Sequence, residues 1–343
     1  MIAALVEGAH QDQFAAETAR FRRELLAHCY RMVGSAHHAE DLVQETYLRA
    51  WRSYARFEGR ASIRSWLYKI ATNVCLTALE PHRIRVLPSG LTGPSDAPDR
   101  QPSQVAPGEV SWLEPLPDRW LASGGDDPAA TVIARESVRL ALIASLQFLP
   151  PRQRAILVLR DVLAFPATEV AVMLGTTTVS VKSALQRART RLKELAPAAD
   201  QIAEPTESQA RALLDQYIAA FENADATALE RLLLADVTIE APPLRTWFTG
   251  RRTCVPFLRN YVLGSPGDWR MLATSANGQP AAVAYTRDQH GSYQAYGICV
   301  LTVTGQGIRQ IRSFADPSLV TLFESWLEPA SSWPSPFEGR GRE

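Results

Sequence analysis

Residues 166–193 read PATEVAVMLGTTTVSVKSALQRARTRLK, and the fold of the chain is best inferred outward from this stretch. Its first half predicts a short helix, and Gly175 stands where a tight turn must follow. Thr176 and Thr177 can cap a second helix, because a hydroxyl accepts a hydrogen bond from a free backbone N–H of the first turn. The second helix carries an apolar stripe at helical spacing, formed by Val181, Ala184, Leu185, Ala188 and Leu192. The pattern predicts a helix-turn-helix.

The opposite face of the second helix is basic. Residues 176–193 contain five basic residues and no acidic one, although the chain as a whole has 36 of each and a formal net charge of zero. Hydroxyl groups near the start of such a helix suit base edges, and Lys and Arg further along suit phosphates. We interpret the motif as a DNA reader; a solvated basic face on an ordinary helix pair is the alternative. This face carries Val179, Lys182, Ser183, Gln186, Arg187 and Lys193.

Length and composition limit the other possibilities. The 343 residues suffice for two or three domains, and the neutral charge balance excludes a wholly basic nucleic-acid coat. No apolar run is long enough to span a membrane, and the N-terminus lacks the positively charged start of a secretion signal. We therefore expect a cytoplasmic protein with no membrane segment. The four scattered cysteines predict buried thiols, with no metal and no cofactor.

A Pro/Gly-rich stretch divides the chain. Residues 81–130 hold nine prolines and five glycines and predict a flexible linker between helical modules at 10–80 and 131–195. Within it, SWLEPLPDRWL (111–121) is so apolar that we expect it to dock on a neighbouring domain. After a second break the pattern predicts helices at 208–234. Period-two runs then predict strands in an α+β module at 205–328, followed by a tail at 329–343; the runs are WRMLATSA, AAVAYTRD, YQAYGICVLTVT and IRQIRSF.

The predicted helix at 39–54, AEDLVQETYLRAWRSY, has two distinct faces. One stripe is an expected core, formed by Val43, Tyr47, Ala50, Trp51 and Tyr54. The other mixes charge, amide and a single leucine, in Asp41, Gln44, Glu45, Leu48 and Arg52. By spacing alone this second stripe is equally consistent with a partner-docking face and with a solvated face that carries one leucine by chance.

The next segment, RFEGRASIRSWLYKIATNVCLTALE (56–80), interleaves cations with aromatic residues. Arg56, Arg60, Arg64 and Lys69 alternate with Phe57, Trp66 and Tyr68. Single-stranded DNA binding needs this combination, because bases stack on rings and phosphates pair with charge. Trp66 also shares a helical stripe with Leu67, Ile70 and Val74, so a place in the core is the alternative for that ring. Asn73 can bond either a flipped base or a neighbouring backbone group.

These motifs together resemble a known family. HAEDLVQETYLRAW followed by SIRSWLYKIATNVCLTAL resembles region 2 of bacterial sigma-70 type initiation factors. LPPRQRAILVLRDVL followed by EVAVMLGTTTVSVKSALQRARTRL resembles region 4. Two such regions without other sigma domains are similar to the extracytoplasmic-function (ECF) group. The segment from LLDQYIAAFENADATALERLLLADVTIEAPP to IRQIRSFADP resembles the SnoaL-like fold of the nuclear transport factor 2 superfamily, a cone-shaped α+β domain.

The resemblance implies a role for each matching residue and no active site of the chain's own. It implies docking on the β′ clamp of core RNA polymerase through Asp41, Gln44, Glu45, Leu48 and Arg49, with a second polymerase contact on the β flap. It implies melting of the −10 promoter element by Arg56, Phe57, Arg60, Arg64, Trp66, Lys69 and Asn73. It implies reading of the −35 element by Thr177, Thr178, Val179, Ser180, Lys182, Ser183 and Arg187.

The C-terminal module has no visible acid–base pair. Some related folds are isomerases and cyclases, which need such a pair in their pocket. The one histidine of the module, His290 in DQHGSY, is typical of a hairpin turn. Asp215, Asp236 and Glu240 are candidates only by being acidic, and a capping or surface role is the simpler expectation. We therefore expect a regulatory module, with a small ligand as a candidate partner and an anti-sigma factor as an optional one.

The resemblance implies the function of an ECF-type sigma factor. We expect the chain to bind core polymerase, recognise both promoter elements and promote melting, with its C-terminal domain modulating this activity. One alternative is a ligand-responsive helix-turn-helix regulator, which gives no role to the polar stripe of the helix at 39–54 or to the cations and aromatic residues at 56–80. The other is a SnoaL-type isomerase or cyclase fused to DNA-binding modules.

Overall fold

The computed structural model describes residues 12–79, 84–121, 137–195 and 205–324. The chain forms two compact units, and each is interrupted in sequence by the other. Unit 1 comprises Met1–Arg85 and Asp118–Ala198, and unit 2 comprises Val86–Pro117 and Ala199–Glu343. Within the described ranges, no helix has both the length and the apolar character needed to cross a membrane. The predicted tail at 329–343 lies outside the described residues.

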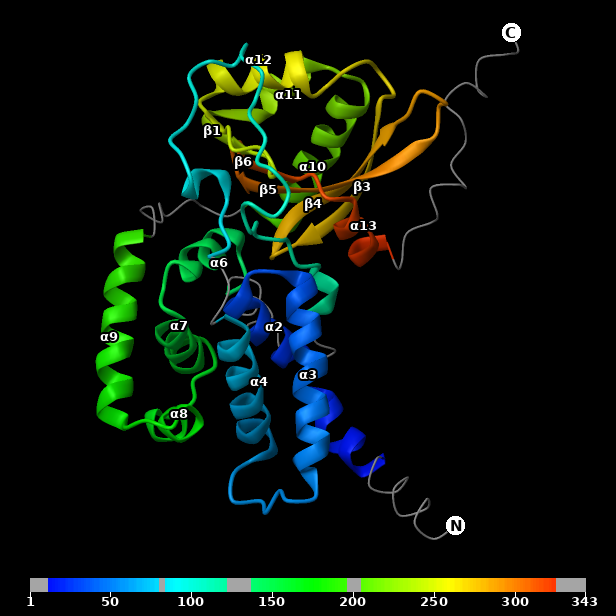
Figure 1. Ribbon diagram of the computed structural model, residues 1–343. Helices are drawn as coiled ribbons and strands as arrows, with labels where there is room; N and C mark the ends of the chain where they lie inside the picture. The colour runs from blue at the N-terminus through cyan, green and yellow to red at the C-terminus, as the bar shows by residue number, and fades with distance from the viewer. Residues whose placement is uncertain (1–11, 80–83, 122–136, 196–204, 325–343) are drawn as a thin grey trace. The chain divides into compact units, whose positions relative to one another are not determined.

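The first half of unit 1 is a helical layer around α2, α3 and α4 (Figure 1). These helices span Arg22–Val33, Ala36–Tyr54 and Ile63–Leu79, and the short η1 turn spans Ala19–Phe21. Gly34 ends α2 in the left-handed conformation at φ 67°. Ser35 then caps α3 by accepting a hydrogen bond from the His38 backbone N–H at 3.1 Å. The Gly-Ser pair therefore makes the sharp corner that lets α3 pack back on α2.

The second half of unit 1 contains the predicted helix-turn-helix. It is built from α6 (Leu140–Gln147), α7 (Pro151–Leu157), the π-helical turn η4 (Val158–Val162), α8 (Ala167–Leu174) and α9 (Thr178–Leu195). Gly175 ends α8 at φ 60°, in the left-handed region that favours glycine. The Thr177 hydroxyl accepts the Ser180 N–H at 3.2 Å and so caps α9. Val181, Ala184, Leu185 and Ala188 are buried, which confirms this part of the predicted stripe, whereas Leu192 at its end is half-buried.

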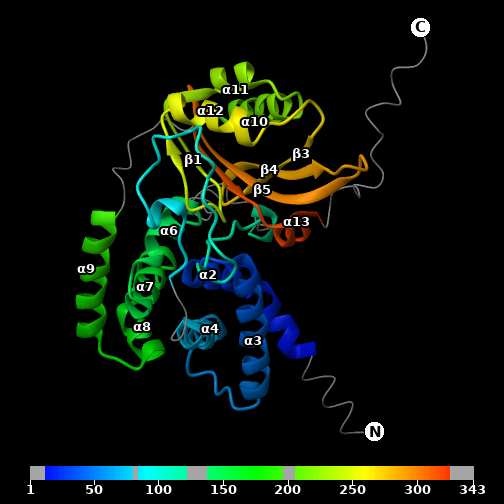
Figure 2. The same ribbon diagram turned by 45° about the horizontal axis from the view of Figure 1, so that its top comes forward.

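Unit 2 is an α+β domain around one six-stranded sheet. Its elements are α10 (Glu207–Glu222), α11 (Ala226–Leu232), β1 (Leu233–Glu240), β2 (Phe248–Thr249), α12 (Arg251–Tyr261), β3 (Trp269–Ala276), β4 (Gln279–Arg287), β5 (Tyr293–Thr304), β6 (Gly307–Phe314) and α13 (Pro317–Glu324). The strand order is β2-β1-β6-β5-β4-β3. Helices α10, α11 and α12 cover one face of the sheet, and α13 lies on the other (Figure 2).

The four predicted C-terminal strands are present, and the β4–β5 turn holds His290 as predicted. The sheet is not wholly antiparallel, because β1 pairs in parallel with β6. Neither β1 nor the two-residue β2 was expected, since LLADVTIE continues an apolar helical pattern and lies beside turn-rich sequence. All four cysteines are buried and free, as expected from their spacing.

Residues 86–117, hereafter the connector, differ most from expectation. The sequence predicts a flexible linker at 81–130, whereas the connector is an ordered part of unit 2. It contains the short η2 turn (Pro88–Gly90), and η3 (Asp118–Trp120) follows it. Figures 1 and 2 both show the connector running beside β1 and α12. The remainder of the predicted linker, at 81–83 and 122–130, lies outside the described residues.

The order of the connector has a local physical cause. A Pro/Gly-rich chain forms no ladder of its own, so its backbone groups need partners elsewhere. Ser95 N–H donates to the Trp247 carbonyl at 2.8 Å, and Val105 N–H donates to the Pro243 carbonyl at 3.0 Å. Near its end, Leu116 N–H donates to Asn277 Oδ1 at 2.8 Å, and the Leu116 side chain is fully buried. The 111–121 segment therefore docks through Leu116 on the α+β domain.

Buried His28 makes the stability of unit 1 depend on pH. Burial, and then the nearby Arg31 charge, lower the His28 pKa to about 3, and its Nε2 lies 3.0 Å from Thr72 Oγ1. In the unfolded chain this histidine binds a proton near pH 6.5, whereas in the folded chain it stays neutral at that pH. Its contribution to the free energy of unfolding is therefore fully present above about pH 6.5 and is lost as the pH falls below that value. We expect the free energy of unfolding to lose up to about 1.4 kcal/mol per pH unit from this group.

Urea titrations between pH 5 and pH 7 measure this slope. His28→Gln keeps a hydrogen-bonding side chain but cannot titrate, so the variant should show a flatter dependence than wild type over the same range. An equal slope in both proteins would show that other groups cause the acid sensitivity.

Candidate nucleic-acid and partner interfaces

The polar face of α3 is exposed as one continuous strip. Asp41 and Gln44 are exposed, and Leu48, one helical turn after Gln44, is 51% exposed. Glu45 and Arg49 form an ion pair of 2.6 Å one helical turn apart. The opposite face is buried at Val43. The predicted docking residues therefore share one solvent-facing surface, which we call the docking face: Asp41, Gln44, Glu45, Leu48 and Arg49.

One residue of the predicted α3 core is more exposed than expected. Trp51 is 38% exposed, and its ring packs edge-on against Phe14 with centroids 5.4 Å apart. Phe14 also contacts Tyr47 and Tyr54 edge-on. The stripe is thus covered by a residue from an N-terminal helical segment at 12–18, which leaves one edge of the tryptophan in solvent.

The start of α4 and the loop before it carry the predicted −10 residues. Arg56 and Arg60 are exposed in the loop, where Arg60 pairs with Glu58 at 2.9 Å. Phe57 packs on half-buried Trp66 with ring centroids 4.8 Å apart. Lys69 and Asn73 follow on the exposed side of α4. Trp66, Lys69 and Asn73 recur at helical spacing, so one edge of α4 presents a ring, a cation and an amide to solvent.

Arg64 is occupied by contacts inside unit 1. Its guanidinium donates to Glu24 Oε2 at 2.9 Å and lies over the Phe165 ring at 4.6 Å from the centroid. The neighbouring Ser65 hydroxyl donates to Glu169 Oε2 at 2.7 Å. Phe165 and Glu169 belong to the helix-turn-helix half of the unit. The first turn of α4 therefore lies against the loop and helix that precede the recognition helix.

The recognition helix α9 presents its N-terminal residues to solvent. Val179 is 71% exposed, and Lys182, Ser183 and Arg187 are exposed on the same side. Thr177, Thr178 and Ser180 form the first turn, where Thr178 is half-buried. A shallow groove continues along this side, lined by Ser183, Gln186, Arg187, Thr190, Arg191 and Glu194.

Two features of this half were missed by sequence reasoning. Arg189, counted among the five basic residues, is held by Asp161 in a bidentate pair with N–O distances of 2.8 and 2.7 Å. The two residues are 28 positions apart, so no local pattern links them. Val172 on α8 is 69% exposed, because it lies off the buried stripe of its helix. Its position outside the apolar stripe of α8 is the sequence signal that could have predicted this exposure.

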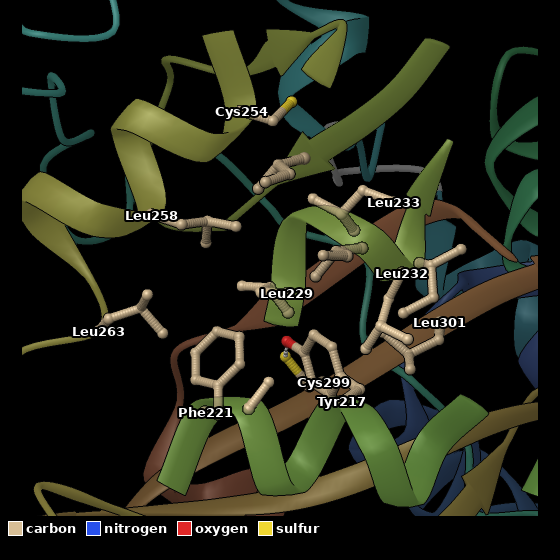
Figure 3. Close-up of a cluster of buried hydrophobic side chains, with 14 of the residues drawn as sticks. Tyr217, Phe221, Leu229, Leu232, Leu233, Cys254, Leu258, Leu263, Cys299 and Leu301 are labelled. Atoms are coloured by element: carbon tan, nitrogen blue, oxygen red, sulfur yellow. Dashed lines mark hydrogen bonds between the residues drawn. The ribbon is translucent and has the colours of Figure 1, made fainter. Parts of the chain in front are cut away.

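Unit 2 contains a pocket of about 480 Å³ between its sheet and helices. Tyr217 and Phe221 reach it from α10, and the Tyr217 hydroxyl lies 3.3 Å from Cys299 Sγ on β5 (Figure 3). Burial raises the pKa of Tyr217 well above its usual value and raises that of Cys299 too, so both stay neutral near pH 7. Among the residues that the structure describes, the pocket is lined by apolar, aromatic, hydroxyl, thiol and amide groups and by no carboxylate or histidine.

The acidic candidates lie elsewhere in unit 2. Asp215 is exposed on α10, and Asp236 forms an exposed pair with Arg309 at 3.4 Å. Glu240 is fully buried, contrary to the expected capping or surface role. Its carboxylate accepts from Arg312 at 3.2 Å and from the Ser89 backbone N–H of the connector at 3.0 Å. Glu240 therefore holds the connector against the sheet.

The comparisons with known proteins identify the family of the two helical regions. Residues 18–83 match the family described as Sigma-70 region 2, and residues 139–192 match Sigma-70, region 4. The chain is 49% identical over 317 residues to the ECF RNA polymerase sigma factor SigG of Mycobacterium tuberculosis, covering 91% of this chain and 84% of the relative. It is 26% identical over 309 residues to the probable ECF sigma factor SigI of the same species, covering 90% and 94%.

A solved structure extends the likeness to the fold. The crystal structure of the M. tuberculosis ECF sigma factor SigJ matches with a TM-score of 0.57 at 24% identity, covering 90% of this chain and 98% of that one. Helical region 2, helical region 4 and an α+β domain follow one another along this chain, as the sequence predicts. The SigG relationship extends beyond both sigma regions into unit 2. The chain belongs to the ECF family of RNA polymerase sigma factors, initiation factors that act with core polymerase on promoter DNA and are not enzymes.

Proposed function

We propose that this ECF sigma factor distributes promoter recognition over three surfaces of unit 1. The docking face on α3 binds the β′ clamp of core RNA polymerase, and region 4 contacts the β flap. The loop at 56–62 and the exposed edge of α4 capture the −10 element, and the start of α9 reads the −35 element. The observation that carries the proposal is the 51% exposure of Leu48, a large apolar side chain, amid the polar residues of the docking face. Core polymerase acts in the cytoplasm, so we place the chain there.

The contact between the start of α4 and region 4 covers part of the proposed −10 surface. Arg64 and Ser65, at the start of the −10 helix, are occupied by Phe165 and Glu169. We infer that region 4 moves away from α4 when polymerase binds, which frees this turn for DNA. Lys69 and Asn73 lie further along α4 and are exposed without such a movement.

In vitro transcription from a template library with randomised upstream sequence tests the function as a whole. With core polymerase, the full chain should select templates that share two boxes at a fixed spacing. An absence of selected starts, under conditions where another ECF sigma factor supports transcription, would contradict the proposal.

A double substitution tests the role of α4 separately. Lys69→Ala with Asn73→Ala should reduce open-complex formation at least about tenfold, because a hydrogen bond that involves a charged group contributes about 1.5–3 kcal/mol and a neutral one about 0.5–1.5 kcal/mol. Permanganate reactivity of unpaired thymines measures the melted fraction. Association with core polymerase is the internal control and should not change, since neither residue lies on the docking face. Unchanged permanganate reactivity would remove these residues from the melting surface.

We also propose that unit 2 modulates initiation through the connector. The connector is continuous with region 2 at Arg85 and leads toward region 4 at Asp118, and it is held by unit 2 between these points. An anti-sigma factor is compatible with this arrangement but is not required by it.

A further inference from the structure

The pocket of unit 2 is walled in part by the connector. Most of its lining comes from α10, α12 and the sheet, but Gln101, Pro102 and Gln104 also line it. These residues belong to the segment that joins the two sigma regions in sequence. The pocket is therefore not a property of the α+β domain alone.

The connector wall is fixed on both sides of the pocket. On one side, Asn260 Nδ2 at the end of α12 donates to Asp99 Oδ1 at 2.9 Å, and the Tyr261 hydroxyl donates to the Asp99 carbonyl. On the other side, Val105 N–H donates to the Pro243 carbonyl at 3.0 Å. Between them, Arg245 N–H donates to the Ser103 carbonyl at 2.9 Å. Residues 100–104 thus bridge the pocket with anchors at both ends.

The lining determines which ligand chemistry fits. Six aromatic side chains contribute: Tyr217, Phe221, Phe257, Tyr261, Trp269 and Tyr296. Hydroxyl or amide groups come from Thr286, Ser313 and the connector glutamines, and no charged side chain of the described part of the chain belongs to the lining. A charged ligand would lose hydration without gaining an opposite charge. A neutral, ring-containing molecule gains apolar burial and stacking, and a few hydrogen bonds fix its orientation.

The size agrees with this class, since pockets for drug-sized molecules span about 300–1,000 Å³. We propose that the pocket binds a neutral, ring-containing small molecule, and that occupancy tightens the connector onto unit 2. A ligand that touches both the domain and the connector binds the docked state of the connector better than any undocked state. It must therefore stabilise docking by its own binding energy.

Nile red, a neutral fluorophore with fused rings, is the probe for the first half of the proposal. Its emission should rise saturably with the full-length chain. Ala284→Phe on β4 and Ser313→Leu on β6 each add bulk to the lining from a different strand, and either should weaken binding at least about tenfold. Ala273→Phe on β3 is the matched control, because Ala273 is exposed and is not part of the lining. Thermal melts identify any variant that fails to fold.

Thiol labelling tests the second half. The native cysteines are all buried, and Val105 of the connector is buried in the docked state without lining the pocket, so a cysteine introduced by Val105→Cys should react with a maleimide only when the connector undocks. Saturating Nile red should slow its labelling about tenfold. A second variant, Gln306→Cys in the exposed β5–β6 turn away from the pocket, should label at the same rate with and without the probe.

Two outcomes overturn the proposal. If folded Ala284→Phe and Ser313→Leu bind Nile red as tightly as Ala273→Phe, the pocket is not the binding site. If binding is lost in those variants but labelling at position 105 is unaffected by the probe, the connector does not respond to occupancy. Neither measurement involves polymerase or promoter DNA, so failure here is separate from failure of the proposed sigma function.

Discussion

Replacing Asp41 and Leu48 together with alanine is expected to weaken the association of this chain with core RNA polymerase by at least about thirtyfold. Leu48 is the exposed apolar centre of the docking face, and Asp41 is an exposed charge two turns earlier on the same side of α3. A central apolar anchor of this kind costs about 2 kcal/mol or more when truncated, which is roughly a thirtyfold loss of affinity. Loss of the flanking carboxylate adds to it by removing electrostatic complementarity.

Co-elution with core polymerase, followed by a titration, measures this effect. The matched control is Leu91→Ala with Asp96→Ala, an exposed leucine and an exposed aspartate in the connector. This control should bind as wild type does. If both double variants bind equally well, the docking face has another role, and the polymerase contact must be sought on a different surface.

Replacing Arg187 with alanine is expected to weaken promoter binding and to reduce its dependence on salt. Arg187 is exposed on the reading side of α9, where it can neutralise a phosphate and release a counterion. The slope of log affinity against log salt concentration should therefore fall in magnitude by about 0.9. Lys182→Ala should act in the same direction, and the double variant should lose about twice as much slope.

Arg189 is the matched control on the same helix. Its guanidinium is paired with both oxygens of Asp161, so its charge is already balanced within the protein. Arg189→Ala should leave the salt slope near its wild-type value. Titrations of the polymerase complex against a promoter fragment over a range of potassium chloride concentrations make the comparison. A larger change in the salt slope for Arg189→Ala than for Arg187→Ala would contradict the assignment of the phosphate contact to Arg187.

Local signals in the sequence determined a large part of unit 1. The apolar stripe of α9, the glycine turn at 175 and the basic face are each encoded within a few residues, and the structure reproduces them. The same holds for β3 to β6, whose alternating patterns and Gly or Asn turns are local. Such features need no knowledge of distant contacts, because periodicity and turn chemistry act along the chain.

Other features depend on contacts between residues that are distant in the sequence, and no local pattern predicts such contacts. The contacts of Arg64 with Glu24 and Phe165 could not be predicted from its sequence neighbours, which indicate only a cation beside aromatic residues. The sequence counts Arg189 among the basic residues of its helix, and only the fold shows that Asp161 pairs with it. Glu240 looked like a surface acid, whereas its buried pairing with Arg312 and Ser89 joins three separate parts of unit 2.

The sequence by itself determined that this chain is built from two sigma regions and an α+β domain, and it named the residues on each candidate surface. Only the tertiary structure decided where the connector belongs and which surface cations are already paired. In both cases the deciding partner is distant in the sequence, so no local pattern identifies it. Proline and glycine mark the connector as a poor former of its own ladder, but several partners of its backbone, such as Trp247, Pro243 and the Glu240 carboxylate, lie more than a hundred positions away.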